Sequence, residues 1–506
     1  MIRVVATASV ALTPVFLAAE TGGPLFAPVE VEPHVYDGGW EHFVGGGVAV
    51  FDCNQDGLPE LYAAGGSNAA QLYLNTSGAG VSFDEATPLD LALTGVTGAY
   101  PLDIDSDGFM DLAVMRVGAD VLLRGVGECR FEPFDTLGFT SGDQWTTAFS
   151  ATWEDGQTLP TLAFGTYVDR SNPDGPFEAC DATMLYRPEG EAYGPPLRLE
   201  PGFCALSLLF SDWGRTGRAD LRISNDRHYY VRGGQEQLWS MDAEPRLFGQ
   251  EENWQPYSIW GMGIASRDLT GDGFPEVYLT SMGDQKFQQF DPTVGGPVWR
   301  DVTYEYGTTA HRPHVGGDGR PSTGWHAQFG DVTNDGRDDI FVSKGNVEQM
   351  PGSAMEDPNS LLEQRADGTF TEVSGPAGIA TFARSRGAAL ADFDQDGRLD
   401  LAVVNRRAPM EIYQNTSENP GNWLAVSLEQ TGTNRNAVGS FIELRTEGGM
   451  QTREVTIGGG HASGQATPEH FGLGQASTGE IRVIWPDATV TEWRKAEVNR
   501  HFKVTR

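Results

Sequence analysis

Short hydrophobic segments alternate along this chain with polar turns rich in Asp and Gly. "GGGVAVFD" precedes and "ELYAAG" follows the turn near residue 52, and "AALADFD" and "DLAVVN" flank the turn near residue 392. Short apolar runs bounded by turn residues predict β-strands joined by hairpins. Copies of this strand–hairpin–strand unit begin near residues 52, 103, 153, 212, 268, 331 and 392, roughly 50 to 63 residues apart. Repeats of this length with four strands each predict an all-β, seven-bladed β-propeller.

The rest of each repeat supplies two more predicted strands. A third strand follows the hairpin, as in "QLYLN", "VLLRG", "HYYVR", "SLLEQ" and "EIYQN", and a fourth often begins with an aromatic residue, such as Phe83. The last repeat lacks a fourth strand, but the segment "FAPV", Phe26–Val29, precedes the first hairpin. We predict that this segment completes the last blade, because a closed ring hides its strand edges. The predicted propeller covers residues 20–418.

The hairpins carry oxygen-bearing side chains at positions 1, 3, 5 and 9, and Gly follows position 5 in five copies. Oxygens at this spacing in a tight loop converge on one point, which suits Ca²⁺. A solvated acidic turn and a Mg²⁺ site are the alternatives, but a solvated turn would not repeat the same ligand positions. About five Ca²⁺ sites are therefore predicted, with the ligands Asp52, Asn54, Asp56, Glu60, Asp103, Asp105, Asp107, Asp111, Asp268, Thr270, Asp272, Glu276, Asp331, Thr333, Asp335, Asp339, Asp392, Asp394, Asp396 and Asp400.

Two further hairpins are degenerate. The copy near residue 212 keeps Asp212, Gly217 and Asp220 but loses the middle carboxylates, and the copy near residue 153 keeps little beyond Asp155 and Gly156. The sequence leaves the binding of calcium open at both.

A different pattern begins near Asn422, after the linker "SENPG" at 417–421. The segments "WLAVSL", "SFIELRT", "REVTIGG" and "EIRVIWP" alternate apolar and polar residues, as strands do when one face is buried. They predict a second, antiparallel β-sandwich-like domain over residues 422–506.

These motifs resemble known repeats. The D-x-[DN]-x-DG-x-x-[DE] hairpins resemble the FG-GAP/VCBS repeats of integrin α-type propellers. "NWLAVSLEQTGTNRNAVGSFIELRTEGGMQTREV", "HFGLGQA" and "IRVIWPDATVTEW" resemble the ASPIC/UnbV domain. Together, and with "HVYDGGWEHFVGGGVAVFDCNQDG", they resemble the cartilage acidic protein 1-like family. The resemblance implies a calcium-binding extracellular propeller and implies no known reaction.

Composition narrows the possible partners and compartments. The chain has 70 acidic and 35 basic residues, a formal net charge of −35, which disfavours nucleic acid as a partner. Residues 1–19 resemble a secretory signal peptide, and no later apolar run is long enough to span a membrane. We therefore expect a secreted or periplasmic monomer.

The cysteine count bears on the same question. There are four cysteines, an even number that favours disulfides in an exported protein, although four buried thiols are the alternative. Cys180 with Cys204 closes the shorter loop, and Cys53 and Cys129 would form the second pair; sequence does not fix the connectivity.

A set of bulky polar and aromatic residues precedes several innermost strands: Trp40, Glu41, His42, Trp145, Trp260, Trp325, His326, Arg384 and Arg386. In a propeller such positions meet at one end of the central channel, where they form either a ligand site or rim packing. His461 and His470 in the second domain are interpreted as structural. The HxxH pair His311 and His314 lacks the further ligands that zinc requires.

We therefore predict a calcium-binding recognition or adhesion-type protein whose partner is an extracellular protein or glycan. The alternative is a lyase-like enzyme acting on acidic polysaccharide, with His42 or His326 as the base and Arg384 or Arg386 holding a carboxylate. If the hairpins lie far from the Trp/His/Arg set, calcium is structural and not catalytic.

Overall fold

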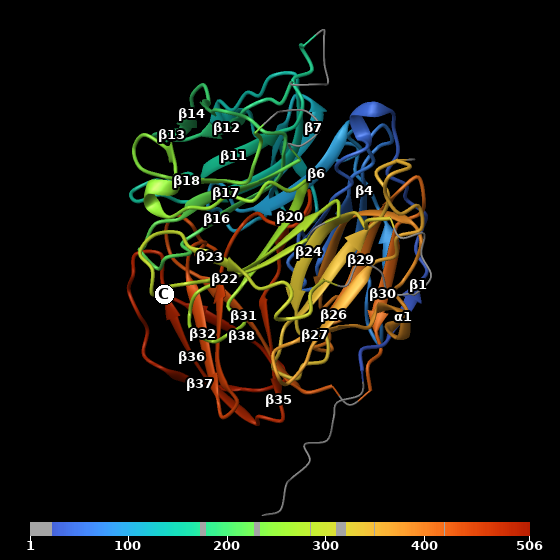
Figure 1. Ribbon diagram of the computed structural model, residues 1–506, viewed down its shortest axis with the longest axis vertical. Coiled ribbons are helices and arrows are strands. Elements are labelled where there is room, and N and C mark those ends of the chain that lie inside the picture. The colour runs from blue at the N-terminus through green and yellow to red at the C-terminus, as the bar shows by residue number, and fades with distance from the viewer. Residues whose placement is uncertain are drawn as a thin grey trace, which may run out of the picture.

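The computed structural model describes residues 23–172, 179–226, 233–283, 285–309, 320–348, 350–418 and 420–506. It is built almost wholly from β-strands, arranged as a ring of sheets with a smaller β-domain beside it (Figure 1). The predicted all-β propeller fold is confirmed. The predicted signal peptide and the pair His311 and His314 lie outside the described residues.

The described propeller strands form seven antiparallel groups of four. In chain order they are β2 (Val48–Phe51), β3 (Glu60–Ala63), β4 (Gln71–Asn75) and β5 (Phe83–Glu85); β6 (Val96–Leu102), β7 (Asp111–Gly118), β8 (Val121–Gly125) and β9 (Phe131–Pro133); β10 (Gln144–Thr152), β11 (Thr161–Thr166), β12 (Thr183–Tyr186) and β15 (Leu197–Leu199); β16 (Ala205–Ser211), β17 (Asp220–Asn225), β18 (Gln237–Ser240) and β19 (Arg246–Leu247); β20 (Gly261–Arg267), β21 (Glu276–Ser281), β22 (Lys286–Phe290) and β23 (Trp299–Asp301); β24 (Gly324–Gly330), β25 (Asp339–Lys344), β26 (Ser360–Gln364) and β27 (Phe370–Glu372); and β28 (Arg384–Ala391), β29 (Asp400–Arg406), β30 (Glu411–Asn415) and β1 (Phe26–Val29). The second and third groups are joined into one sheet by pairing of β7 with β10 at Gln144↔Gly118 and Trp145↔Val117.

The first strands of these blades form the inner ring. β2, β6, β10, β16, β20, β24 and β28 each contact the next in this order, and β28 contacts β2. The last blade takes its outer strand from the start of the described chain, because β1 pairs with β30 from Phe26↔Asn415 to Val29↔Ile412. This pairing covers the edge of β30 that would otherwise be open.

Inner strands are more deeply buried than the strands nearer the rim. β6, "VTGAYPL", and β16, "ALSLLFS", are buried at every residue, because other blades or the channel contents cover both faces. β6 contains Gly and Ala, and β16 contains Ala and two Ser, small residues that fit the narrow centre of the ring. The third strands β4, β8, β22 and β30 instead share a pattern in which the first and fourth residues are half-buried and the other three are buried. Burial therefore falls from the centre to the rim.

One predicted strand lies outside the described part of the chain. The sequence analysis places a third strand of the fourth blade at "HYYVR", residues 228–232, which the structure does not describe. In the described part, β17 pairs with β18, from Leu221↔Trp239 to Ile223↔Gln237.

Short helices and one extra hairpin complete the propeller. The helices are η1 (Trp40–His42), η2 (Asp135–Leu137), η3 (Gln250–Glu252) and α1 (Ser374–Ala377), and the hairpin is β13 (Pro188–Glu189) with β14 (Ala192–Tyr193). None of the described helices is long and apolar enough to cross a membrane. Disulfides join Cys53 to Cys129 and Cys180 to Cys204, which confirms the predicted disulfide bonding.

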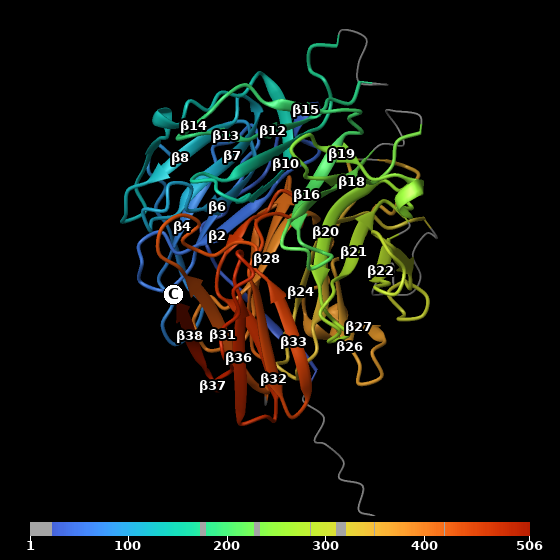
Figure 2. The same ribbon diagram turned by 90° about the vertical axis from the view of Figure 1, so that its left-hand side faces the viewer.

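The C-terminal domain lies at one end of the propeller, where its strands form two sheets (red in Figure 2). One sheet contains β35 (Glu469–Gly474), β31 (Asn422–Glu429) and β38 (Arg500–Thr505), and the other contains β33 (Gly449–Glu454), β32 (Phe441–Thr446), β36 (Thr478–Ile484) and β37 (Arg494–Glu497). Side chains from both sheets share one core, including Leu424, Ile442, Phe471 and Trp485. The pairing is mostly antiparallel, but β31 and β38 run parallel.

A loop of the C-terminal domain, residues 455–467, enters the propeller channel. Backbone bridges join it to five inner strands: Ile457 to Ala151, Gly458 to Leu209, Gly460 to Ile264, Ser463 to Ala99, and β34 (Gln465–Ala466) to β2. The three glycines 458–460 all have positive φ, and a Cβ on Gly460 would lie 2.3 Å from the His326 ring. Glycine is needed here because L side chains fit neither this backbone nor this space. The loop therefore closes the channel from inside.

Candidate functional site

The five intact hairpins share one backbone conformation between the first and second strands of their blades. The Gly after position 5 has φ between 86° and 94°, and position 4 has φ between 57° and 72°. Backbone in the left-handed region is costly for most residues, which explains why Gly occupies the position that has the larger φ. Position 9 is the first residue of the second strand in every intact copy, so the strand fixes where that carboxylate lies.

Backbone hydrogen bonds hold the carboxylates at both ends of each loop. The carboxylate at position 1 accepts the N–H of the turn Gly at 2.7 to 3.0 Å. The carboxylate at position 9 accepts the N–H of position 2 at 2.8 to 3.1 Å. The two ends of each cluster are therefore fixed by the fold itself.

Several oxygens in these loops are buried and have no hydrogen-bond partner among the described residues: Asp103 Oδ1, Glu276 Oε1, Thr333 Oγ1 and Asp394 Oδ1. In two hairpins, three carboxylates offer oxygens that all lie within 4.8 Å of one another, namely Asp103, Asp105 and Asp111, and Asp392, Asp394 and Asp400. Buried, unpaired oxygens grouped in this way are what a Ca²⁺ ion requires. The residues present therefore fit the predicted cation.

The raised pKa values of carboxylates in these loops also favour a bound cation. Burial raises the pKa of Asp111 to about 8, and the neighbouring Asp105 and Asp103 raise it further, although backbone N–H groups oppose the shift. Burial likewise raises the pKa of Glu276 to about 8, with a further contribution from Asp268. Without a positive charge in the loop, these carboxylates are costly to ionise.

Arginines contact the position 5 carboxylate in three hairpins. Arg124 from β8 lies 2.8 Å from Asp107 and 3.0 Å from Asp105. Arg337 pairs with Asp335, and Arg398 pairs with Asp396, within their own loops. These guanidinium groups balance part of the charge. They also hold the outer oxygens of the loop in place.

The degenerate hairpin at 212–220 keeps the loop shape but uses its oxygens differently. Gly217 N–H donates to Asp212 at 2.8 Å, as in the intact copies. At position 9, Asp220 accepts the Nε1–H of Trp213 at 3.0 Å and the N–H of Met241 at 3.1 Å. Positions 3 and 5 are Gly214 and Thr216. Protein donors therefore occupy the oxygens that remain.

Side chains at position 4 link neighbouring hairpins, a feature that the sequence analysis missed. Gln395 donates to Gly57 O at 2.6 Å, and Gln55 donates to Gly108 O at 2.9 Å. Asn334 donates to Gly397 O at 2.7 Å, and Arg215 donates to Gly273 O at 2.8 Å. Each bond runs from one blade to the turn Gly of the next. Position 4 carries a polar side chain in most copies, which was the available signal.

The C-terminal domain docks on this same face. His470 Nε2 lies 2.7 Å from Asn334 Oδ1, and Gly421 N–H donates to Thr333 O at 3.0 Å. Arg453 forms a buried ion pair with Asp338 at 2.9 Å. Burial lowers the pKa of His470 to about 4, so it is neutral at pH 7. His470 thus has a structural contact, as the sequence analysis interpreted it.

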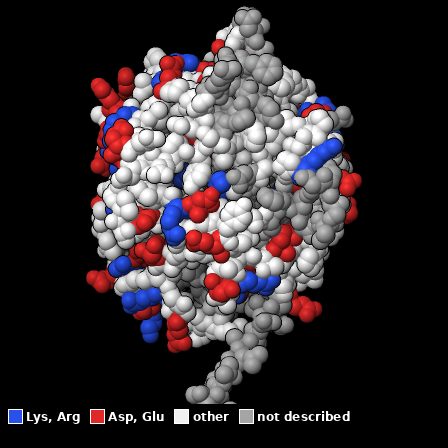
Figure 3. All heavy atoms as spheres, viewed as in Figure 1, with Lys and Arg blue, Asp and Glu red and all other residues white. Residues whose placement is uncertain are grey.

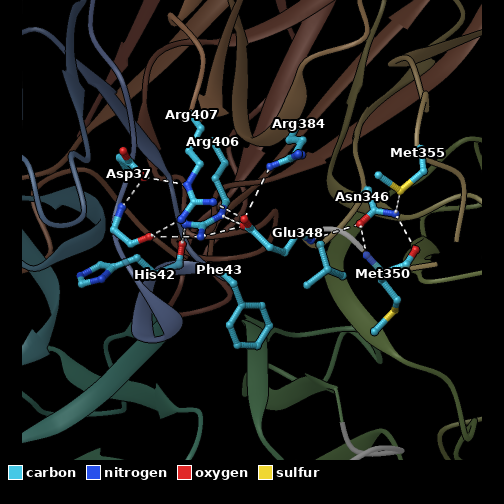
Figure 4. Close-up of polar contacts among 12 residues, drawn as sticks. Asp37, His42, Phe43, Asn346, Glu348, Met350, Met355, Arg384, Arg406 and Arg407 are labelled. Carbon is cyan, nitrogen blue, oxygen red and sulfur yellow. Dashed lines mark hydrogen bonds and ion pairs between the residues drawn. The ribbon is translucent and has the colours of Figure 1, made fainter. Parts of the chain in front are cut away.

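A charged cluster occupies the opposite end of the channel (Figure 4). Glu348 lies 2.9 Å from Arg406 and 3.8 Å from Arg384, and it also pairs with Arg407. Arg407 lies 2.9 Å from Asp37. Arg406 is buried, but Arg384 and Arg407 reach solvent, so three guanidinium groups surround one carboxylate at this mouth. On the face drawn in Figure 3, acidic and basic side chains are interspersed.

Four residues of the set predicted to meet at this mouth are buried: Trp145, Trp325, His326 and Arg386. Arg386 stacks on Trp325 at 3.9 Å and donates to the carbonyls of Phe43 at 3.0 Å and Val347 at 2.7 Å. Both side chains are fully buried, and His326 is 3% exposed. These bulky side chains at the start of inner strands pack against one another, as in the rim-packing alternative of the sequence analysis.

The other predicted mouth residues are more accessible. Trp40 is 52% exposed and its ring lies edge-on to Trp145, whereas Trp260 is half-buried beside the same aromatic cluster. Burial lowers the pKa of His42 below its usual value, and its backbone carbonyl accepts a bond from Arg406.

The hairpins and the charged mouth lie at opposite ends of the inner strands. Trp325 is the second residue of β24, and Asp331 directly follows the strand. At about 3.3 Å per residue, they are separated by roughly 20 Å. Hairpin cations would therefore be remote from the mouth, which favours a structural role for them.

Comparison with known proteins gives matches to both parts of the chain. Residues 430–506 match the ASPIC and UnbV family, and residues 52–114 and 352–403 match the FG-GAP-like repeat. Mouse cartilage acidic protein 1 is 26% identical over 232 residues, which cover 45% of this chain and 34% of that protein. The human protein is 28% identical over 164 residues, covering 30% of this chain and 22% of that protein. The matched region thus spans about a third or less of these relatives, and the resemblance predicted from the motifs is confirmed.

Solved structures with similar folds are more distant. BBS1N, in complex with ARL6DN, is 9% identical, covers 78% of this chain and 98% of its own, and has a TM-score of 0.45. The WD40 domain from Toxoplasma gondii coronin is 10% identical, covers 79% of this chain and 89% of its own, and has a TM-score of 0.42.

Proposed function

We propose that this chain is an extracellular recognition protein of the adhesion type, in which Ca²⁺ bound at five hairpins is structural. The observation that carries the proposal is the repeated loop with fixed carboxylates at both ends and buried oxygens that lack partners among the described residues. Two disulfides and similarity to cartilage acidic protein 1 support an extracellular location. Asp, Asn, Thr and Glu oxygens would hold the ion, which would supply the missing positive charge.

The channel mouth is the ligand surface in this proposal. Three arginines against Glu348 and Asp37 leave one net positive charge at this spot on a chain with a net charge of −35, so it would attract an acidic group. Arg is well suited to bidentate recognition of carboxylate or sulfate groups. The exposed ring of Trp40 lies at the same end and offers an apolar contact. The partner would be an extracellular protein or glycan with an acidic group.

Two measurements test the proposal. Metal analysis of the full chain dialysed against calcium should give about five ions, and a ratio near zero would refute the calcium sites. A protein-and-glycan array should identify acidic partners whose binding weakens about 10-fold or more in Arg407→Ala, because Arg anchors often dominate interfaces. If the partners bind the Arg407→Ala variant as tightly as the parent protein, the binding surface is not the channel mouth.

The lyase alternative requires a base beside the arginines. The lowered pKa of His42 keeps its imidazole neutral at pH 7, and Arg406 contacts its backbone, which favours this residue over His326. Incubation with acidic polysaccharides, followed by ultraviolet absorbance for an unsaturated product, tests it. Product formation that disappears in His42→Ala would support the enzyme, and no product with the parent protein would argue against it.

A further inference from the structure

A cavity of about 680 Å³ lies between the propeller and the C-terminal domain. Its wall includes inner-strand residues, the channel loop 456–460 and β31 of the C-terminal domain. Ligand sites commonly fall in this size range and often occur at domain interfaces. Exposed Gln395, Asn499 and His501 lie on its rim, whereas buried His326 lies in its wall, so the cavity extends inward from solvent.

Polar atoms without partners among the described residues line this cavity. They are His326 Nε2, His470 Nδ1, Trp153 Nε1 and Arg267 Nε. Buried polar atoms in folded proteins are almost always hydrogen-bonded, so a group of them around one space indicates a ligand or ordered water. The Gln328 side chain lies within hydrogen-bonding reach of the His326 ring, but its amide already bonds the backbone of Leu390 at 2.9 and 3.1 Å.

The hydrogen-bonding roles of these atoms follow from their other contacts. His461 N–H donates to His326 Nδ1 at 3.0 Å, so the proton of the neutral His326 ring lies on Nε2. His470 places its Nε2 2.7 Å from the Asn334 amide oxygen, so its Nδ1 is an acceptor. Trp153 Nε1 and Arg267 Nε are donors. The cavity therefore presents three donors and one acceptor.

The other residues of the cavity wall limit which classes of ligand can bind. Arg267 is paired with Glu469 at 3.4 Å, and the hairpin carboxylates of Asp52, Asp103 and Asp392 also line the space, which disfavours an anion. Indole rings of Trp153 and Trp423 supply flat apolar surface. A neutral ligand that is rich in hydroxyl groups and has apolar ring faces matches all of these features.

We propose that this interdomain cavity binds a short neutral oligosaccharide. Its hydroxyl oxygens would accept from His326, Trp153 and Arg267, one hydroxyl would donate to His470, and a sugar ring face would lie on an indole. This site does not depend on the function proposed for the charged mouth, because Glu348, Arg384, Arg406 and Arg407 are not among the residues that line the cavity.

The test uses the full chain in calcium and a panel of neutral trisaccharides of glucose, galactose, mannose and N-acetylglucosamine. Saturation-transfer NMR and calorimetry should detect binding of at least one member. Trp153→Phe, which keeps a ring but removes the Nε1–H, should weaken that binding about 3- to 10-fold, as expected for one lost hydrogen bond. Ser427→Trp, a half-buried position on the wall, should block it by more than 10-fold.

Arg407→Ala at the channel mouth is the control and should leave trisaccharide binding unchanged. If Trp153→Phe does not fold, as judged by its melting temperature, Ser427→Trp decides the question. The proposal is overturned if no trisaccharide binds at millimolar concentration, if both cavity variants bind normally, or if a crystal soaked with the panel shows only ordered water in the cavity.

Discussion

The hairpins at 103–111 and 212–220 have the same shape but are held in different ways. In the first, Asp103, Asp105 and Asp111 bring oxygens within 4.8 Å, and Asp103 Oδ1 lacks a partner among the described residues. In the second, Glu454 of the C-terminal domain enters, accepting from Ser211 Oγ at 2.6 Å and from Asp212 N–H at 2.7 Å.

The degenerate loop also carries an arginine that contacts the C-terminal domain. Arg215, at position 4, lies 3.2 Å from Glu443 and 4.2 Å from the ring of Phe441, both on β32. The same turn that carries the full set of predicted calcium ligands in one blade is therefore held by contacts with another domain in a different blade. The comparison teaches that loss of calcium ligands need not mean loss of the loop, provided that protein groups satisfy its polar atoms.

The largest expected effect is that of removing calcium, which should act on the intact hairpins and spare the degenerate one. Excess EGTA should lower the melting temperature by on the order of 10 °C, because one site at 100 times its Kd contributes about 2.7 kcal/mol. Scanning calorimetry measures the change, and added Ca²⁺ should reverse it more fully than equal Mg²⁺. An unchanged melting temperature would mean that the intact hairpins, like the degenerate one, do not depend on calcium.

Matched substitutions at position 9 sharpen the contrast. Asp111→Ala should lower the bound calcium by about one ion per chain and cost about 2 to 4 kcal/mol in calcium, because it also leaves the N–H groups of Ile104 and Gly125 without their acceptor. Asp220→Ala should destabilise the fold without changing the metal content. Mass spectrometry of the native protein counts the ions, and equal losses in both variants would contradict the comparison.

The domain contact should be independent of calcium. Glu454→Ala removes the acceptor of two buried donors and should cost about 1 to 3 kcal/mol of unfolding free energy, with the same value in Ca²⁺ and in EGTA. Denaturant titration measures it. Glu447→Ala, at an exposed position nearby in sequence, is the control and should have no effect. A loss that appears only in calcium would show that Glu454 belongs to a metal site.

The smallest loss of stability is expected from removing one of the position 4 hydrogen bonds that link neighbouring hairpins. Gln395→Ala removes one neutral hydrogen bond to Gly57 O and should cost about 0.5 to 1.5 kcal/mol. Ser106→Ala is the matched control, because Ser106 occupies the same position in its hairpin and its hydroxyl has no partner among the described residues. Chemical denaturation should separate the two variants, and identical midpoints would argue that the links contribute nothing.

Much of the calcium-hairpin architecture could be predicted from the sequence because its signals are local. Asp103, Asp105 and Asp111 are near in sequence, so ligand spacing and the turn Gly could be read without the fold. The mouth could not be predicted in the same way. The sequence left Trp325 and Arg386 open between a ligand site and rim packing, because their burial depends on packing between strands from different blades.

By itself, the sequence determined the all-β propeller, the hairpin loops and the two-part resemblance, since strand period and ligand spacing are properties of neighbouring residues. Only the tertiary structure decided that the loop around His461 fills the channel, that Glu454 stabilises a degenerate hairpin more than 200 residues earlier in the chain, and that the two domains enclose a cavity. These contacts join residues far apart in sequence, so their energies depend on distances that no local pattern contains.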